Sequence, residues 1–258
     1  MGILQIERDG PVARAWLDRA ERHNALNGEL ADAMLWAFES LAAEPGVRVV
    51  VLGGRGPSFC AGADLDAMKD AAEATFEQNL AEAARLAGLF AAVSRCPKPV
   101  VGRVHGNVLG GGVGLCCACD IPVAADDARF GLSEVRLGIL PAIISPYVVR
   151  RIGDAHAREL MLTGERFDAA TALRIGLVQH VVPAAELDAK VDERVSQLLA
   201  GGPEAQGRIK VLLERRADST WEQYREALPR LLAEARASDE AKEGLAAFLE
   251  KRRPQWAG

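Results

Sequence analysis

The sequence feature that most constrains the fold is a short run of almost continuously apolar residues. Residues 47–52 read Val-Arg-Val-Val-Val-Leu, and such a run is typical of a strand that is covered on both faces of a parallel sheet. An amphipathic helical pattern comes before it, with apolar side chains on one face over residues 26–41, and Pro45-Gly46 ends that helix. A buried strand that follows an amphipathic helix predicts the α/β class.

The same alternation of strands and helices recurs along the first 180 or so residues. A second amphipathic helix is expected over residues 75–94. From about residue 184 the strand signal disappears and only helices are expected, so the chain has a helical C-terminal appendage. Periodicity alone leaves open whether this appendage is a packing or an oligomerisation element. The expected strands are residues 3–7, 12–17, 47–52, 99–104, 120–124 and 178–182, and the expected C-terminal helices are residues 186–199, 203–217, 221–236 and 240–252.

Composition excludes several classes of protein. The chain has 258 residues, 31 basic and 36 acidic, and a net charge of −5, so it lacks the basic excess of a nucleic-acid binder. Its N-terminus has no signal-peptide pattern. The longest apolar run, residues 104–125, is interrupted by His105, Asn107 and Asp120, which argues against a membrane span. We therefore expect a cytoplasmic protein with neither nucleic acid nor membrane as partner.

Familiar cofactor and nucleophile motifs are absent. There is no Walker A loop, no complete dinucleotide fingerprint and no nucleophile elbow, and the four histidines have no metal-ligand spacing. Cys116 and Cys119 form a C-x-x-C motif, but it lies in an apolar run. Buried thiols are therefore favoured over a redox or zinc site. We expect no metal.

Two glycine-rich loops are not explained by folding alone. Residues 53–65 follow one expected strand, and residues 104–114 follow another and lead into an expected helix. Small residues let a ligand approach the backbone, and a loop that enters a helix presents unpaired N–H groups. Two such loops that converge would bind an oxyanion. The alternative is that each loop is only a tight turn with close helix packing.

The motifs in and around these loops occur in the order found in one family. With them, the chain resembles the enoyl-CoA hydratase/isomerase (crotonase) superfamily over nearly its whole length. The matching blocks are residues 59–65 (Phe-Cys-Ala-Gly-Ala-Asp-Leu), 110–112 (Gly-Gly-Gly), 119–121, 130–138 and 162–165, with 22–27 near the N-terminus and 243–252 near the C-terminus.

This resemblance implies a crotonase-like ββα superhelix, or spiral, over residues 1–195, which holds the acyl-CoA site. It implies that residues 196–258 are a helical region that mediates trimers, often paired into hexamers. The substrate is an acyl-CoA thioester, and no metal or redox cofactor is needed because CoA is part of the substrate. The site residues that it implies are the catalytic positions Glu134, Ala61, Gly111 and Gly114, and the CoA-binding residues Ala25, Leu26, Ala61, Gly62, Ala63, Asp64, Phe248 and Lys251.

Within that set, the resemblance gives each position a role. The backbone N–H groups of Ala61 and Gly111 form the oxyanion hole, and Phe248 and Lys251 reach the CoA of a neighbouring subunit. Typical hydratases of the family hold a water between two glutamates. The second of these is present as Glu134, but Gly114 occupies the position of the first. The two-glutamate mechanism therefore cannot operate unchanged.

A single carboxylate leaves the reaction open on chemical grounds. Glu134 can activate water for hydration, or it can move a proton between C2 and C4 as a Δ3,Δ2-enoyl-CoA isomerase does. Residues 132–153, with residues 110–115, resemble the branch of methylglutaconyl-CoA and isohexenylglutaconyl-CoA hydratases. This favours a hydratase for branched glutaconyl esters, in a pocket made roomier by the missing glutamate. The alternatives are the isomerase and a catalytically weak acyl-CoA-binding paralogue.

Overall fold

The larger of two sheets forms the centre of the body. A computed structural model describes residues 2–257 of the chain. Its first sheet has six strands in the order β1-β2-β3-β5-β7-β10. β1 and β2 pair antiparallel and the remaining neighbours pair parallel. All six are the strands expected from sequence: β1 (Leu4–Asp9), β2 (Val12–Leu17), β3 (Val49–Gly54), β5 (Val100–Val104), β7 (Ile121–Ala125) and β10 (His180–Val182).

The second sheet consists of four short strands that the sequence pattern did not predict. Each has three residues, which is too short for a period-2 pattern to stand out. Each of the first three follows a long strand of the larger sheet after a few residues, so each turn of the chain adds one strand to both sheets. The prediction of an α/β body built as a ββα spiral is confirmed. The short strands, in sheet order, are β4 (Ser58–Cys60), β6 (Asn107–Leu109), β8 (Arg129–Gly131) and β9 (Arg166–Asp168).

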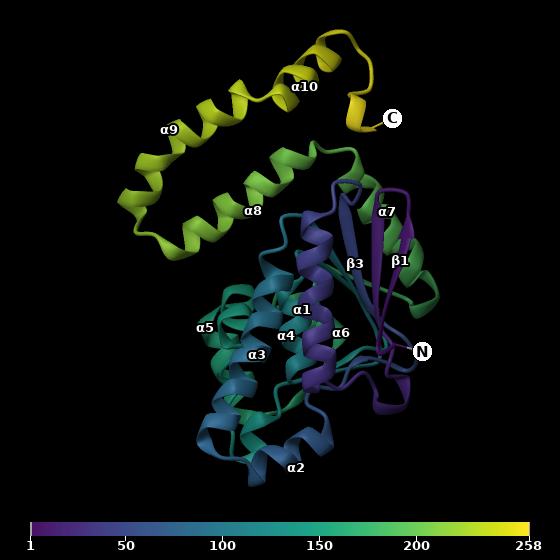
Figure 1. The fold of residues 1–258 in the computed structure, drawn as a ribbon, viewed down its shortest axis with the longest axis vertical. Helices are drawn as coiled ribbons and strands as arrows, with labels where there is room; N and C mark the ends of the chain where they lie inside the picture. The colour runs from purple at the N-terminus through teal and green to yellow at the C-terminus, as the bar shows by residue number, and fades with distance from the viewer. Residues whose placement is uncertain (1, 258) are drawn as a thin grey trace.

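Helices cover both faces of the larger sheet. α1 (Gly28–Ala43) and α3 (Phe76–Ser94) lie over one face, and α7 (Leu187–Leu199) lies over the other (Figure 1). β3 shows the result directly, because Val50 and Leu52 belong to the cluster under α1 and α3. Val49 and Val51 belong to the cluster that includes residues of α7. The continuous apolar run of the sequence therefore reflects burial on both faces.

The remaining helices are shorter or lie outside the larger sheet, and η4 lies at the C-terminal end of the chain, beside α10. α4 and the 3-10 helix η2 begin where strands β6 and β8 end, which places them beside both glycine-rich loops. The bounds are α2 (Leu65–Glu73), α4 (Gly111–Ala118), α5 (Ser145–Thr163) and α6 (Ala169–Arg174), with the 3-10 helices η1 (Ala20–Arg22), η2 (Glu134–Leu137), η3 (Ala184–Glu186) and η4 (Gln255–Ala257).

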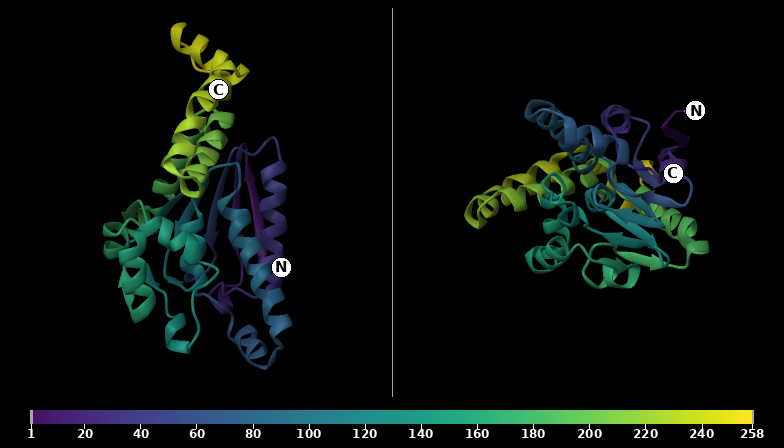
Figure 2. Two further views of the ribbon diagram at one scale, coloured as in Figure 1. Left: turned by 90° about the vertical axis from the view of Figure 1, so that its left-hand side faces the viewer. Right: turned by 90° about the horizontal axis from the view of Figure 1, so that it is seen from below.

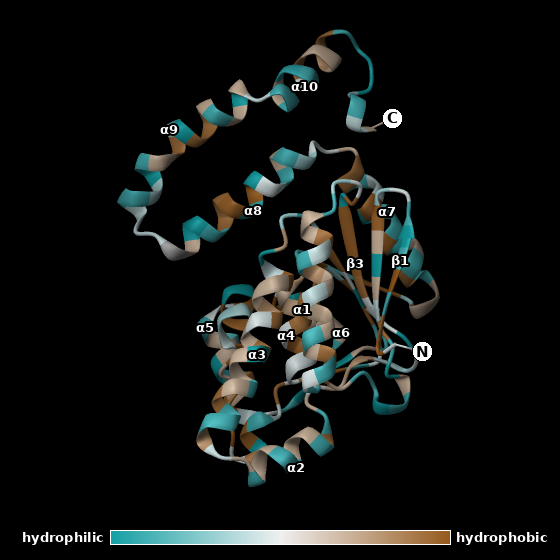
Figure 3. Ribbon diagram, in the orientation of Figure 1, coloured by the Kyte–Doolittle hydropathy of each residue, from teal (hydrophilic) through white to brown (hydrophobic). Residues whose placement is uncertain are grey.

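Three C-terminal helices extend from one end of the body (Figures 1 and 2). They are α8 (Pro203–Asp218), α9 (Trp221–Ala237) and α10 (Asp239–Leu249), close to the expected ranges. Figure 3 shows apolar turns on these mostly hydrophilic helices. Large apolar side chains are exposed there, among them Ile209, Val211, Leu213, Trp221, Leu232, Leu245, Phe248 and Leu249. Within residues 2–257, no helix is long and apolar enough to cross a membrane.

The five cysteines are free and buried, as the sequence indicated. Burial raises the pKa of the Cys60, Cys117 and Cys119 thiols to about 12. Thiols with such a pKa are protonated and unreactive at neutral pH.

The packing of the second sheet generates a stability prediction. Phe130 of β8 is fully buried, and its ring stacks on that of Phe167 in β9 at a centroid distance of 5.6 Å. We expect Phe130→Ala to lower the free energy of unfolding by about 3–5 kcal/mol in urea denaturation, because a buried ring leaves a cavity. Trp36→Ala, at a side chain that is 71% exposed, is the control and should change stability by less than about 0.5 kcal/mol. Equal effects would contradict this role for the stack.

Candidate active site

The first glycine-rich loop pairs with the segment that precedes α1. Leu26 and Ala63 form an isolated parallel bridge, in which the Leu26 N–H donates to the Gly62 carbonyl (2.7 Å) and the Asp64 N–H donates to the Leu26 carbonyl (2.8 Å). In this pairing the N–H of the middle residue, Ala63, points away from Leu26. The structure gives that N–H no acceptor among residues 2–257. Ala63 is therefore available as a backbone donor to a ligand.

The Ala61 N–H, by contrast, is already engaged. It donates to the His23 carbonyl at 3.0 Å. The prediction that Ala61 is an oxyanion donor is therefore wrong, and the unpaired donor lies two residues further along the same loop, at Ala63. The direction of an N–H depends on which strand the residue pairs with, and that pairing joins residues far apart in the sequence.

The second glycine-rich loop delivers Gly111 to the start of α4. Gly110 precedes the helix at φ +47° and ψ −114°, a conformation that favours glycine. Its N–H donates to the Gly131 carbonyl (2.8 Å), and its carbonyl accepts from the Gly114 N–H (3.2 Å). Gly111 is the first residue of the helix, where N–H groups lack intrahelical partners and the dipole is positive. This N–H is the second candidate donor, as predicted.

The two loops approach each other closely. Gly62 has a φ of +94°, and a Cβ built on it would lie 2.9 Å from the Leu109 carbonyl oxygen. A Cβ on Gly110 would lie 3.9 Å from the Gly62 Cα. The two glycine-rich loops therefore converge backbone to backbone.

Glu134 lies beside this convergence. It begins η2, directly after β8, and is half-buried. A Cβ on Gly110 would lie 3.2 Å from Glu134 Oε1, so the carboxylate faces the turn that leads into α4. Glu134 Oε2 is buried, and the described part of the chain offers it no hydrogen-bond partner. Burial raises the pKa of this carboxyl group above its ordinary value of 4.5, which brings it closer to the range of a general base.

Gly114 is a packing position. It is buried in the interior of α4, where a Cβ would lie 2.2 Å from Ile144 Cγ2 and 2.9 Å from Phe90 Cε1. A glutamate has no room there, and the space that its side chain would need is filled by Ile144 and Phe90. The expectation of a roomier pocket at this position is therefore wrong, and nothing in the structure gives Gly114 itself a catalytic group.

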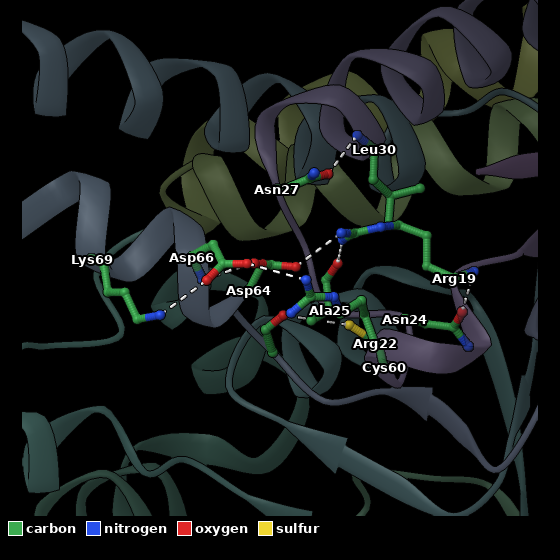
Figure 4. A network of polar contacts seen from close by, with 11 residues as sticks. Arg19, Arg22, Asn24, Ala25, Asn27, Leu30, Cys60, Asp64, Asp66 and Lys69 are labelled. Carbon is green, nitrogen blue, oxygen red and sulfur yellow. Dashed lines mark hydrogen bonds and ion pairs between the residues drawn. The ribbon is translucent and has the colours of Figure 1, made fainter. Parts of the chain in front are cut away.

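A network of polar contacts fixes the first glycine-rich loop (Figure 4). Arg19 Nη2 and Asp64 Oδ2 form an ion pair at 2.9 Å, with side chains only 12% and 5% exposed. Arg19 also donates to the Ala25 carbonyl, and Asp64 caps α2 by accepting from the Asp66 N–H (2.9 Å). The structure thus brings the predicted CoA-binding residues of both segments together: Ala25, Leu26, Ala61, Gly62, Ala63 and Asp64. Sequence reasoning missed Arg19, whose partner Asp64 lies 45 positions away.

The other two predicted CoA-binding residues lie elsewhere. Phe248 is on α10 and Lys251 follows that helix, at the opposite end of the long axis from α2, which Asp64 caps (Figure 1). The Phe248 side chain is 79% exposed. These residues therefore do not join the candidate site of their own chain.

These features define a ββα spiral protein in which unpaired backbone N–H groups lie next to a half-buried carboxylate. No cluster of His, Cys, Asp or Glu among the described residues has the arrangement of a metal site. A sequence model of the enoyl-CoA hydratase/isomerase family matches residues 7–258. The chain belongs to this family, and the predicted resemblance is confirmed at that level.

Curated relatives and solved structures agree with this assignment. The chain is 35% identical to the enoyl-CoA hydratase ACTT6 of Alternaria alternata, over 96% of this chain and 81% of that protein. An enoyl-CoA hydratase structure from Shewanella pealeana has 38% identity and a TM-score of 0.94, covering 98% and 96% of the two chains. Pseudomonas aeruginosa AtuE has 37% identity and a TM-score of 0.95, covering 99% and 100%.

The contact between Gly114 and Ile144 predicts a compensating pair of substitutions. We expect Gly114→Ala to lower the free energy of unfolding by about 1–3 kcal/mol, because the methyl group overlaps Ile144. In the double variant with Ile144→Ala the two losses should be less than additive, by about 1 kcal/mol or more, in a urea-denaturation double-mutant cycle.

Gly88→Ala is the matched control for that cycle. Gly88 also lies inside a helix, α3, but its added Cβ would be 3.7 Å from Leu35 Cδ2, an ordinary contact. In this variant the free energy of unfolding should rise by up to about 1 kcal/mol, because alanine has a higher helix propensity than glycine. Strict additivity of Gly114→Ala and Ile144→Ala would contradict the packing role of Gly114.

Proposed function

We propose that the chain is an enoyl-CoA hydratase that adds water across the C2=C3 bond of an acyl-CoA thioester. The observation that carries the proposal is the buried, unpartnered Oε2 of Glu134, which lies beside the turn where two backbone donors converge. In this proposal the Ala63 and Gly111 N–H groups hold the thioester oxygen. Glu134 is the base. Membership of the family, and the names of its relatives, support the assignment.

The chemistry needs these groups for separate reasons. When water attacks C3, the electron pair of the double bond moves toward the thioester, and negative charge develops on the carbonyl oxygen. Each preorganised N–H donor stabilises that charge by about 3 kcal/mol. Glu134 accepts one proton of the water molecule while the remaining hydroxyl group bonds to C3. The protonated Glu134 then returns a proton to C2. One carboxylate therefore completes the addition of one water molecule.

The proposed substrate class is a branched glutaconyl-CoA ester. The resemblance of residues 132–153 to hydratases of such esters supports it. Exposed apolar side chains follow Glu134 directly, with Leu137 59%, Ile139 54% and Leu140 74% exposed. These side chains offer an apolar surface to a branched acyl group. Gly114 adds no room for the branch, because Ile144 and Phe90 fill the space beside it.

The remaining features of the proposal concern assembly and surroundings. We propose a trimer, or a dimer of trimers, in which the exposed apolar side chains of α8, α9 and α10 meet neighbouring copies. Phe248 and Lys251 then reach a neighbour's CoA. The protein needs no metal or redox cofactor, because CoA is part of the substrate. We propose a cytoplasmic location.

Glu134→Gln tests the base. We expect kcat to fall by at least about 100-fold, because an amide cannot accept the proton. We also expect the affinity for the CoA ester, measured calorimetrically, to stay close to that of the wild type. In the wild type, kcat/KM should decline on acidification through a pKa above 4.5, since only the ionised carboxylate is a base and burial raises its pKa.

Glu159→Gln, at an exposed carboxylate on α5, is the control and should retain wild-type turnover. Wild-type turnover by Glu134→Gln would refute the assignment of the base. A wild-type protein that binds CoA esters and turns none of them over would instead be the acyl-CoA-binding paralogue.

A panel of three esters tests the reaction and the substrate class. Crotonyl-CoA and 3-methylglutaconyl-CoA lose the absorbance of their conjugated double bond on hydration, whereas a 3-enoyl-CoA gains it on isomerisation. We expect hydration of both conjugated esters, with a higher kcat/KM for the branched one. A preference for crotonyl-CoA would refute the branched substrate and leave the hydratase standing. Reaction of the 3-enoyl ester alone would make the protein an isomerase, which its single carboxylate also permits.

A further inference from the structure

The loop that presents Ala63 is fixed by a cation that does not face the reacting groups. Arg19 follows β2, and its guanidinium lies almost buried between two backbone segments. Nη2 pairs with Asp64 Oδ2 at 2.9 Å, and Nη1 donates to the Ala25 carbonyl. One planar group therefore joins Asp64, the residue after Ala63, to Ala25, the residue before Leu26 (Figure 4). These two segments form the bridge that turns the Ala63 N–H away from Leu26.

Asn24 completes the connection. It is fully buried and has a φ of +56°. Its Oδ1 accepts from the Arg19 N–H (2.9 Å), and its Nδ2 donates to the carbonyls of Arg55 (2.9 Å) and Ser58 (2.7 Å). The backbone of Arg19 is thereby tied to both ends of the turn before β4. Movement of Arg19 is therefore coupled to the whole first glycine-rich loop.

The energetics of the buried Arg19–Asp64 ion pair indicate that its main role is to fix the geometry of the loop. A buried ion pair gains little net stability, because desolvation of both groups offsets their attraction. Burial alone would raise the pKa of Asp64, but the Asp66 N–H and the Arg19 guanidinium outweigh it and hold the pKa below its ordinary value. Asp64 is therefore ionised at neutral pH, and its two oxygens have fixed partners, Asp66 N–H on Oδ1 and Arg19 on Oδ2.

We propose that Arg19 is a positioning residue of the active site, which aims the Ala63 N–H at the thioester oxygen through Asp64 and Ala25. Arg19 itself does not touch the reacting atoms. This inference rests on the proposed function, since it assumes that Ala63 is an oxyanion donor. A planar guanidinium is required because it makes two hydrogen bonds in different directions at fixed separation, which a lysine ammonium on a flexible stem does not.

The first test separates turnover from binding. We expect Arg19→Met to lower kcat by about 10- to 100-fold on the best ester of the panel, because a small displacement of a donor weakens transition-state stabilisation. KM should change by less than about threefold, since ground-state contacts to CoA are kept. Arg19→Lys should recover only part of kcat.

Arg22→Met is the matched control for this loss. Arg22 ends η1, three residues after Arg19, and pairs with Asp66 at 3.2 Å, but its side chain and that of Asp66 are 50% and 56% exposed. Removal of this exposed pair changes the net charge equally, and kcat should stay at the wild-type value. A loss in Arg22→Met equal to that in Arg19→Met would assign the effect to charge and overturn the proposal.

A second readout reports on the donor directly. 4-Dimethylaminocinnamoyl-CoA is a conjugated thioester whose absorption moves to longer wavelength when its carbonyl oxygen is polarised. We expect saturated wild type, Arg22→Met and Glu134→Gln to give the full red shift. Arg19→Met should give a clearly smaller one at saturation. A full red shift in Arg19→Met, with unchanged kcat, would overturn the positioning role.

Failure of the proposed function would look different. If the saturated wild type gives no red shift, Ala63 and Gly111 are not oxyanion donors. The proposed role of Arg19 is then refuted as well. If thermal denaturation shows that Arg19→Met is unfolded, Arg19→Lys carries the test. It must then show a reduced red shift and a reduced kcat while its KM is preserved, and wild-type values for all three would refute the proposal.

Discussion

The structure depends on the contact of two backbones at a distance that admits no side chain between them. A Cβ on Gly112 would lie 2.1 Å from the Cys60 carbonyl oxygen, and one on Gly62 would lie 2.9 Å from that of Leu109. Only glycines permit this approach. The two short strands β4 and β6 pair directly beside this contact. The second sheet therefore holds the two loops together. The half-buried Glu134 reaches the same place because β8 is the next strand of that sheet.

Helix α4 links this contact to the rest of the body. Its first residue, Gly111, presents a backbone N–H without an intrahelical partner, and the positive end of the helix dipole lies there. At its other end Arg151 donates to the carbonyls of Cys117, Cys119 and Asp120. A cation at the C-terminal end of a helix complements the dipole. The apolar, cysteine-rich sequence of α4 follows from its burial on all sides, so its thiols are packing groups.

The parts of the structure that could be predicted from sequence are those with local signals. The six strands of the larger sheet were found because continuous or alternating apolar residues extend over five or more positions of the sequence. The C-terminal helices were found because the strand signal disappears from about residue 184. The short strands of the second sheet carry no such pattern. Ala61 was predicted as the oxyanion donor in place of Ala63, because the direction of the Ala63 N–H depends on pairing with Leu26. That residue lies 37 positions earlier in the chain. The occupation of the space at Gly114 by Ile144 is likewise a non-local contact that no spacing reveals.

A site built from backbone donors responds to substitution in an unusual way. No replacement other than proline deletes the N–H of Ala63 or Gly111, so in the proposed site the stabilisation of a developing anion persists while the loops hold their geometry. What substitution does alter is the carboxylate beside them, the packing around α4, or the polar network that aims the loop. In this chain Ile144 fills the space beside Gly114, and the ion pair between Arg19 and Asp64 fixes the loop that carries Ala63. The proposed reaction is therefore determined less by the backbone donors themselves than by the side chains that surround and orient them.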